Sequence, residues 1–574
     1  MAKNNKWDSI EWLGTLIFPP EYERHGFKVS GMGPFDADVE ERLYHFAGKI
    51  DTEYMSNALF IKNFHGSLLE VLPEKYAKLE FPKDFMPYLR EVKSFIDAKK
   101  EEAKTKEAKD AKKHEKAQAE ELKSLNGFII LNGDTQPLAT FAIEPPGILI
   151  TRGDDKRIGC WKYRVRPEDV TINATKGKGP TPPAGHHWKA VTENKGALWC
   201  AHYFVKFYGF KERLPKKVLL GATSVVTKDR EQDKYEKARQ LILKWDEIEA
   251  HIMKGLKSTD PKTKLTATVV YLVQQTGCRI GGEKDLDVVA DTVGISTLRK
   301  EHVSLSGHTL TLEFLGKDSV LYKNTLPICK EAAEVIMERL KVADDKTEIF
   351  EGVTSVNASD FLRDVVPKAS IKTFRTAYGT KLLCEELQKH DFSDPSMTVT
   401  QKLHIYDLCN LAVAKKLNHK KTPPKNFDEK TKVMEERLTT KEQAVGDLEK
   451  KLTEDLKALL KQVQIAKETF TGNHLKKTLE KYDEKKHKLT VRLDNAREQI
   501  EQRKTRLQFR EETKEVAIGT SRSSYSSPRI AYSWCKDTGV SIDKVYSKSA
   551  IGKMAWAEDT ERSYWRKFPS VKAN

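Results

Sequence analysis

Hydrophobic residues recur at spacings of three, four and seven over residues 428–512, a pattern that predicts two long helices. The first set is Met434, Leu438, Val445, Leu448, Leu452, Leu456, Leu459 and Val463, and the second is Leu475, Leu479, Tyr482, Leu489, Leu493, Ala496, Ile500 and Leu507. The turn residues Thr471-Gly472-Asn473 separate them. The pattern therefore predicts an antiparallel coiled coil folded back at Gly472. A dimerising coiled coil is the alternative, and the turn signal argues against it.

The chain before this segment has two different patterns. Residues 1–222 begin with a region rich in aromatic residues and prolines, which predicts short packed elements, and end in loop-rich, strand-like sequence. Between these parts, residues 97–124 are almost all strong helix formers with few apolar anchors, which predicts one solvated helix. Residues 223–425 are mostly helical in pattern. Their one clear interruption, around the turn at Gly316, predicts a β-hairpin.

The last segment, residues 513–574, predicts a helix from Pro528 to a stop at Gly539 and a second helix around residues 550–557. A chain of 574 residues is too long for one core. We therefore expect an α+β multidomain fold. Its predicted domains are residues 1–222, 223–425, 426–512 and 513–574.

The charge balance favours a polyanionic partner. The chain has 100 Lys and Arg against 84 Asp and Glu, giving a net charge of +16. Residues 426–512 hold 21 Lys and Arg and 18 Asp and Glu, so nearly all of the excess lies in the globular parts. Nucleic acid fits such a surface, although a membrane surface or an acidic protein would also fit.

The cysteines and the hydropathy of the chain argue against a zinc protein, a disulfide-rich secreted protein and a membrane protein. The seven cysteines are scattered and form no C-x-x-C pair, which argues against a zinc site and against a disulfide framework. The N-terminus has no apolar signal core, and no run of about 18 apolar residues occurs. We therefore expect an intracellular protein that does not span a membrane.

Five residues in distinctive local settings carry the candidate chemistry: Arg279, Lys317, Arg375, His419 and Tyr525. A tyrosine hydroxyl has a pKa near 10, so attack on a phosphodiester needs help. The charge developing on phosphorus must be neutralised and the leaving oxygen protonated. Arginine suits the first task because its planar fork donates two hydrogen bonds and keeps its proton. Lysine suits the second because its pKa can be lowered by neighbouring cations.

These settings are Gly277-Cys278-Arg279-Ile280-Gly281, Leu315-Gly316-Lys317-Asp318, Lys372-Thr373-Phe374-Arg375, Leu417-Asn418-His419-Lys420 and Ser523-Ser524-Tyr525-Ser526. Singly, each is most simply a surface or packing residue. In this order, they resemble the catalytic set of the eukaryotic-type DNA topoisomerase I, or type IB, family, and the resemblance runs almost end to end.

The resemblance implies a role for each residue. Tyr525 would be the nucleophile that forms a 3′-phosphotyrosyl bond and releases a 5′-hydroxyl. Arg279 and Arg375 would bind the scissile phosphate, His419 would hydrogen-bond a non-bridging oxygen, and Lys317 would be the general acid. Further DNA-binding candidates around the cleavage site are Arg152, Asp318, Ser524 and Lys372.

The resemblance also implies the architecture and the partner. It implies a bilobed DNA clamp with a mixed α/β cap lobe, a mostly helical catalytic lobe, an antiparallel coiled-coil linker and a small helical C-terminal domain. The substrate would be double-stranded DNA, preferentially supercoiled, bound by a monomer. No ATP would be needed, since the phosphotyrosine conserves the energy of the broken bond, and a divalent cation would be at most stimulatory. The nucleus is the expected location, with a viral or other DNA-containing compartment as the alternative.

Two positions depart from the family pattern. Ile150 stands where the family usually has a second arginine beside Arg152, and Ser524 stands where it usually has asparagine. Camptothecin-type poisons exploit that asparagine, so we expect reduced sensitivity to them.

Three other classes of function compete with this interpretation. A tyrosine recombinase uses a similar residue set, but usually has histidine where Lys372 stands, and its last histidine and tyrosine lie close together in sequence. A metal-dependent nuclease could use Asp285, Asp287 and Asp291 with two cations. A non-catalytic DNA-binding or scaffold protein would not need a tyrosine at position 525.

Overall fold

The computed structural model describes residues 6–103, 105–282, 291–344, 347–424 and 426–568. The chain folds into two compact units. The first comprises residues 1–233, 281–351 and 552–556, and the second residues 234–280, 352–551 and 557–574. Both helices and sheets are present, so the expected mixed α/β character is confirmed. No helix within the described ranges is both long enough and apolar enough to cross a membrane.

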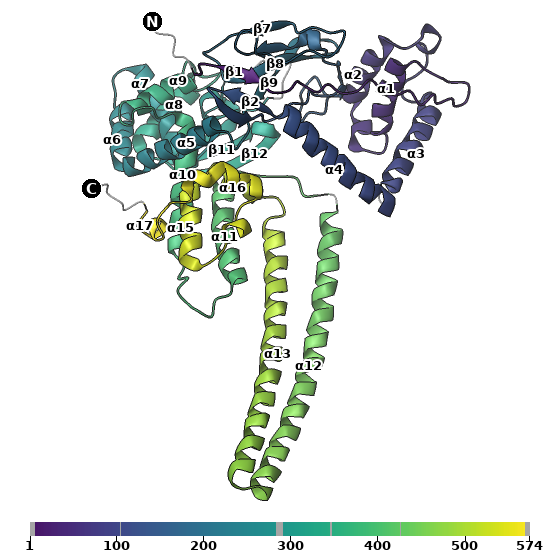
Figure 1. The fold of residues 1–574 in the computed structure, drawn as a ribbon. Coiled ribbons are helices and arrows are strands. Elements are labelled where there is room, and N and C mark those ends of the chain that lie inside the picture. Colours follow the sequence, from purple (N-terminus) through teal and green to yellow (C-terminus); the bar gives the residue numbers. More distant parts are fainter. Residues whose placement is uncertain (1–5, 104, 283–290, 345–346, 425, 569–574) are drawn as a thin grey trace. The chain divides into compact units, whose positions relative to one another are not determined.

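Two antiparallel-rich sheets form one part of the first unit (Figure 1). β1 pairs with β2 and β2 with β3, while a six-stranded sheet has the order β4-β5-β8-β6-β7 with β9 beside β8. Their shared core holds Trp7, Ile129, Ile172 and Ala201. The strands are β1 (Ile10–Trp12), β2 (Phe128–Leu131), β3 (Asp134–Pro137), β4 (Gly147–Ile148), β5 (Trp161–Lys162), β6 (Thr171–Asn173), β7 (Ala190–Thr192), β8 (Trp199–Phe207) and β9 (Phe210–Leu219).

A helical layer with an aromatic core forms another part of the first unit. Its helices are α1 (Ala37–Ala47), α2 (Ala58–Leu69) and α3 (Met86–Glu102), while α4 (Lys106–Asn126), which is mostly exposed, leads on to β2. The Phe46 and Phe64 rings stack with their centres 4.5 Å apart. These helices are longer than the short elements that the aromatic-rich sequence suggested. The prolines lie in the loops between them or, in the case of Pro87, in the first turn of a helix, where a proline does not break it. The single helix expected over 97–124 is divided, since α3 ends at Glu102 and α4 begins at Lys106.

The predicted hairpin is confirmed and gains a third strand. β11 (Thr309–Gly316) pairs with β12 (Val320–Pro327) in antiparallel register, and β10 (Val303–Ser306) pairs with the other edge of β11. A short 3-10 turn, Lys317–Ser319, joins β11 to β12 and carries Lys317 at the tip. α8 (Lys330–Val342) follows this sheet.

The second unit is helical. It contains α6 (Trp245–Leu256), α7 (Pro261–Thr276), α9 (Ser355–Arg363), α10 (Ile371–Gln388), α11 (Val399–Lys416), α14 (Ile518–Ser524), α15 (Pro528–Thr538) and α17 (Tyr564–Lys567), while α5 (Val225–Leu243) and α16 (Lys548–Met554) begin in one unit and end in the other. Local signals set its key helix ends. α15 has Pro528 at its first turn and Gly539 with φ 72° after its last residue, as the sequence predicts.

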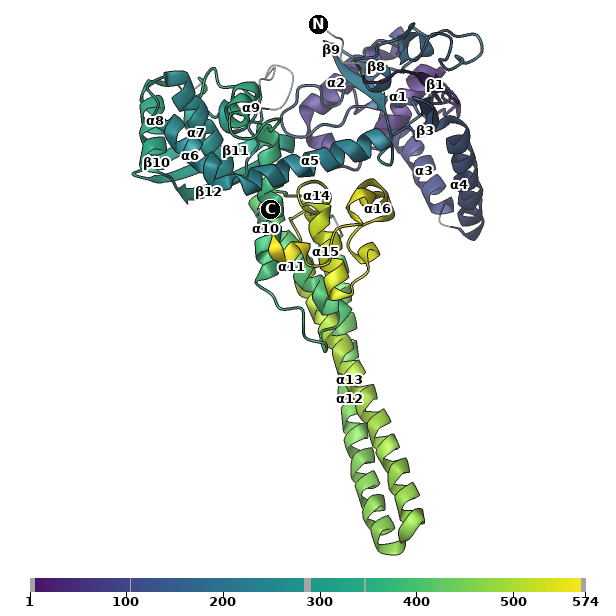
Figure 2. The same cartoon turned by 60° about the vertical axis from the view of Figure 1, so that its left-hand side comes forward.

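Two long helices of the second unit, α12 (Phe427–Thr469) and α13 (Gly472–Glu512), run antiparallel and side by side (Figures 1 and 2). Val445, Ala496 and Ile500 form a small apolar cluster between them. Glu449 pairs with Arg497 at 2.7 Å and Glu442 with Lys504 at 3.1 Å. The chain turns back at Gly472, whose φ of 61° suits a residue without a side chain.

Candidate active site

Tyr525 lies at the turn between α14 and α15. Its N–H donates to the carbonyl oxygen of Ser521 at 3.0 Å, which closes the last turn of α14. Ser521 is fully buried, whereas Tyr525 is half-buried, so the turn is anchored while the phenol ring reaches the surface. Pro528 begins α15 three residues later and fixes the direction in which the chain leaves. The tyrosine is thus presented by a rigid turn.

Three of the other predicted residues meet around this phenol. The guanidinium carbon of Arg375, on α10, lies 4.9 Å from the centre of the Tyr525 ring. The ring centre of His419 lies 5.1 Å from that of Tyr525, and Nε2 of His419 is 3.4 Å from Nη2 of Arg375. Arg279 is exposed, and it lies near enough to Tyr525 to lower the pKa of the phenol. The fold therefore brings together residues as far apart in sequence as Arg279 and Tyr525, which are separated by 246 positions.

Helix ends explain how these side chains converge. Gly277, the residue directly after α7, has φ 66°, so the chain turns out of the helix two residues before Arg279. α11 ends shortly before Asn418, whose φ is 54°. His419 then accepts a hydrogen bond from the N–H of Ala517 at 2.7 Å through its backbone carbonyl. That bond ties the end of α11 to the start of α14 and so brings His419 beside the segment that carries Tyr525.

The cations change the titration of their neighbours. Burial raises the pKa of the Tyr525 hydroxyl, but the charges of Arg375 and Arg279, together with their hydrogen bonds, outweigh burial and leave this pKa below its ordinary 10.0. Burial and the same two charges lower the pKa of His419 from 6.5 to about 4. Burial also lowers the pKa of Arg375. At neutral pH the site therefore holds two cations, a neutral imidazole and a phenol that is easier to ionise.

The lowered pKa of His419 predicts how stability depends on pH. In the unfolded chain His419 takes up a proton near pH 6.5, whereas the folded protein resists it until about pH 4. The unfolded state therefore binds more protons between these values, and the free energy of unfolding falls as the pH falls from 6.5 toward 4. We expect the melting temperature of His419→Gln to fall less than that of the wild type between pH 7.5 and 5.

The control for this experiment is His487→Gln, at an exposed histidine on α13. Its melting temperature should follow the wild type throughout. Parallel curves for wild type and His419→Gln would contradict the assigned burial of a neutral imidazole.

The described part of the site is short of negatively charged side chains. Among the residues that the structure describes, no carboxylate forms an ion pair with Arg375 or Arg279. Arg375 is only 7% exposed, and its Nη2 donates to the backbone carbonyl of Leu417 at 3.1 Å. Nε of Arg375 and Nδ1 of His419 are both buried, and neither has a hydrogen-bond partner among the residues that the structure describes. Because buried cations and donors are normally paired, this arrangement favours an anionic ligand beside Tyr525.

The remaining candidates occupy other positions. Lys317 is exposed at the tip of the β11–β12 turn, and Arg152 is exposed in a loop after β4; both belong to the first unit. Asp318 lies in the same turn as Lys317, and its side chain is outside the described residues. Lys372 is exposed on α10, one turn before Arg375. The carbonyl of Ser524 accepts a hydrogen bond from Lys234 at 3.4 Å.

The acidic cluster considered for a nuclease is not brought together by what the structure describes. Asp285 and Asp287 lie outside the described residues. Asp291 pairs with Arg299 at 2.6 Å. Among the described residues, no group of three or more His, Cys, Asp or Glu side chains is arranged to hold a metal ion.

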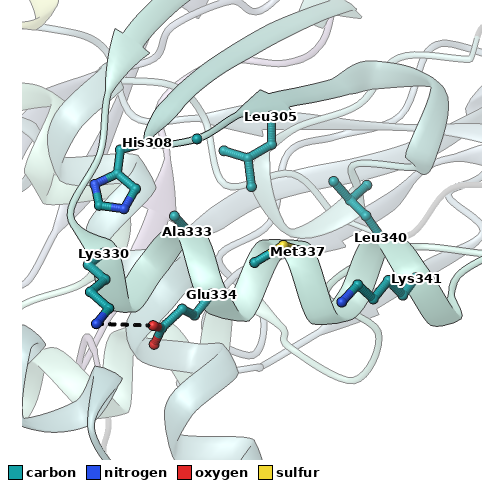
Figure 3. Close-up of a pocket in the computed structure, with 9 residues that line it drawn as sticks. Leu305, His308, Lys330, Ala333, Glu334, Met337, Leu340 and Lys341 are labelled. Atoms are coloured by element: carbon teal, nitrogen blue, oxygen red, sulfur yellow. Dashed lines mark ion pairs between the residues drawn. The ribbon is translucent and has the colours of Figure 1, made fainter.

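A groove elsewhere in the first unit is separate from these residues. It has a volume of about 390 Å³ and lies between the turn at Gly307 and α8, with Leu305 and Met337 among its lining (Figure 3). Lys330 and Glu334 form an ion pair at its edge, 3.7 Å apart. Since β11 runs from this turn to Gly316, Lys317 lies at the opposite end of the strand, roughly 25 Å away. The groove holds none of the candidate residues.

A tyrosine flanked by arginines in a site that favours an anion has the features of an enzyme that attacks phosphodiesters. Comparison with known families narrows this class. The family model described as "Eukaryotic DNA topoisomerase I, DNA binding fragment" matches residues 5–210, and "Eukaryotic DNA topoisomerase I, catalytic core" matches residues 223–452. A third, "C-terminal topoisomerase domain", matches residues 497–566.

Curated relatives agree with the family models. DNA topoisomerase 1 of Homo sapiens is 30% identical over 575 residues, which cover 96% of this chain and 71% of that protein. The mitochondrial DNA topoisomerase I of Rattus norvegicus is 30% identical over 564 residues, which cover 96% of this chain and 91% of that protein. DNA topoisomerase 1 of Caenorhabditis elegans is 30% identical over 587 residues, which cover 97% of this chain and 67% of that protein.

The chain therefore belongs to the eukaryotic DNA topoisomerase I family. It functions as a type I DNA topoisomerase, an isomerase that breaks and rejoins DNA strands. The tyrosine-recombinase alternative is not favoured, since all three matching models describe topoisomerases.

Proposed function

We propose that Tyr525 is the nucleophile of a type IB reaction. Its hydroxyl oxygen attacks the scissile phosphorus, the bond to the 5′-oxygen breaks, and a 3′-phosphotyrosyl diester forms. Tyr525 gives up its proton and the leaving 5′-oxygen gains one, so religation is the same step reversed. The observation that carries this proposal is the Tyr525 hydroxyl set against two arginines that have no carboxylate partner among the described residues.

Arg375, Arg279 and His419 would stabilise the transition state. The unpartnered Nε of Arg375 and Nδ1 of His419 are donors available to a phosphate. Guanidinium groups bind non-bridging oxygens through paired hydrogen bonds that strengthen as negative charge develops. His419 would act as a neutral hydrogen-bond donor, because its lowered pKa of about 4 leaves it uncharged at neutral pH.

The protonation step is assigned to Lys317 by the family resemblance. Its exposed position at the tip of a turn leaves the ammonium group free to reach a bound strand. Arg152, Asp318, Lys372 and Ser524 would contact DNA around the cut. Contacts from the cationic members, Arg152 and Lys372, to phosphates would fix the position of the duplex without reading its sequence.

We further propose that a cap lobe and a catalytic lobe clamp duplex DNA as a monomer, with a preference for supercoiled substrate. The net charge of +16 supports a polyanionic partner, and such binding should weaken steeply with salt. Rotation of the cut strand would relax supercoils of either sign. The nucleus is the proposed location; two of the relatives are named as mitochondrial enzymes, so a mitochondrion is the competing one.

The reaction is proposed to need neither ATP nor a divalent cation. Plasmid relaxation with EDTA present and ATP absent tests this directly. We expect full relaxation and, after a detergent quench, protein bound covalently to DNA. Relaxation that depends on ATP or on Mg²⁺ would contradict the proposed chemistry.

The α12–α13 pair is proposed to be a coiled-coil linker that restrains strand rotation, because residues 471–512 carry 12 Lys and Arg against 8 Asp and Glu. The Glu449–Arg497 and Glu442–Lys504 pairs fix the register. Deleting residues 454–467 together with 479–492 removes two heptads from each helix and keeps that register. We expect plasmids to be relaxed more distributively by the shortened enzyme.

Two measurements on the shortened protein separate the loss of length from general instability. The shortened protein should keep the wild-type melting temperature and the wild-type rate of adduct formation on a short duplex. Unchanged processivity across a salt series would refute the proposed brake.

A further inference from the structure

The backbone on either side of residue 526, next to Tyr525, is hydrogen-bonded to a side chain of another helix, α10. The hydroxyl of Thr380, on α10, donates to the carbonyl oxygen of Tyr525 at 3.4 Å and accepts from the N–H of Ser527 at 3.0 Å. One hydroxyl group thus bridges the chain on both sides of residue 526, and uses its donor and an acceptor lone pair to do so. Thr380 is 2% exposed, so water does not compete for these bonds.

This use of a helical threonine differs from others in the chain. Thr266, Thr268 and Thr276 each donate to the carbonyl oxygen four residues earlier in their own helix, which is the usual outlet for such a hydroxyl. The bonds of Thr380 go instead to the segment of Tyr525, 145 residues away in sequence. The hydroxyl of Thr380 therefore stabilises the turn that carries Tyr525 instead of its own helix.

The same face of α10 brings the turn close to an arginine. Gly379 lies four residues after Arg375, so both are on one side of the helix. A Cβ atom at Gly379 would stand 2.7 Å from the carbonyl oxygen of Tyr525 and 3.2 Å from its Cβ, so the turn packs directly on the helix backbone. Helix α10 thus fixes the distance between the Tyr525 ring and the Arg375 guanidinium, whose carbon lies 4.9 Å from the ring centre.

We propose that Thr380 is a positioning residue for strand cleavage, which holds the Tyr525 backbone on α10 so that the phenol stays aligned with Arg375. This inference rests on the proposed role of Tyr525 as nucleophile. Thr380 itself does not touch DNA in this account. Its hydroxyl acts through the angle at which Tyr525 is presented, and a nucleophile must approach in line and within about 3–3.5 Å of the phosphorus.

The test compares three variants. Thr380→Val keeps the branched shape and removes both hydrogen bonds, whereas Thr380→Ser keeps the hydroxyl. Thr373→Val is the matched control, because Thr373 lies on the same helix, is 7% exposed, and shares its hydroxyl bond with Ser370 at 2.9 Å instead of with the turn. Single-turnover cleavage is measured at saturating concentrations of a duplex that traps the covalent adduct.

We expect Thr380→Val to slow cleavage by about 10- to 100-fold, because a small misplacement of a reacting group has effects of that order. Thr380→Ser and Thr373→Val should cleave at close to the wild-type rate. DNA affinity, measured in a Tyr525→Phe background so that no strand is cut, should be unchanged by Thr380→Val. A loss confined to the cleavage rate and rescued by serine is not the result of general destabilisation.

Two kinds of failure are distinguishable. Wild-type cleavage by Thr380→Val, no rescue by serine, or an equal loss in Thr373→Val would overturn the positioning role while the role of Tyr525 stands. An adduct that still forms in Tyr525→Phe would overturn the nucleophile assignment and the positioning role with it.

Discussion

Tyr525→Phe should lose both plasmid relaxation and the covalent adduct, with a rate reduced by roughly 10⁴-fold or more, as expected when the nucleophile of a covalent mechanism is removed. The change deletes one hydroxyl group and leaves the ring between Arg375 and His419, so the packing of the turn is retained. DNA affinity should be preserved, because the arginines that we propose to bind the phosphate remain. Gel assays of relaxation and of detergent-trapped adduct measure the loss.

The matched control is Tyr532→Phe, the same substitution seven residues further along, at a buried tyrosine on α15. It should relax plasmid like the wild type. If Tyr525→Phe relaxed plasmid at a measurable fraction of the wild-type rate, another residue would have to supply the nucleophile.

Arg375→Lys is the second change with a large expected effect. Lysine keeps the positive charge but cannot reproduce the planar fork that reaches Leu417 and faces both Tyr525 and His419. We expect the single-turnover cleavage rate to fall by about 10²–10³, the usual cost of removing one donor to a developing oxyanion. DNA binding should change far less, since the affinity of a protein for duplex DNA is usually spread over many phosphate contacts.

Arg363→Lys provides the comparison for this loss. Arg363 also donates to a backbone carbonyl, that of Ala369 at 3.2 Å, but lies on α9 and pairs with Asp360. Its replacement should leave cleavage unchanged. Similar losses in both variants would mean that arginine-to-lysine changes act through folding rather than through the transition state.

Local signals in the sequence predict much of the fold. Pro528 and Gly539 mark the ends of α15, and the alternation around Gly316 marks the β11–β12 hairpin, because caps, turns and strand periodicity are properties of neighbouring residues. The repeat over residues 428–512 likewise predicts two long helices, and α12 and α13 occupy that segment.

Pairings between distant segments were not predicted. β1 pairs with β2 across more than 100 residues, and its three residues are too few to show a period. β10 gives no sequence signal for the same reason, since Val303–Ser306 is short and its apolar residues are only half-buried. Alternating residues in a sequence can indicate a strand, but they do not indicate which other strand it pairs with.

The candidate site was predicted by resemblance rather than by periodicity. Arg375, His419 and Tyr525 do meet, but no spacing in the sequence brings residues 44 and 150 positions apart together. No sequence pattern marks Thr380, because a buried threonine in a helix is common and usually bonds within its own helix. The shifted pKa values of His419 and Tyr525 were equally invisible, since they arise from burial and from cations that only the fold brings near.

The central claim is that Tyr525 becomes joined to a 3′ phosphate. The most direct measurement is to trap the enzyme on a labelled duplex without ATP and with EDTA, digest the adduct, and identify the modified peptide and the DNA end by mass spectrometry. The account predicts a peptide modified at Tyr525 that carries the 3′ end, with a free 5′-hydroxyl on the other fragment. Attachment through another residue, or to a 5′ phosphate, would contradict it.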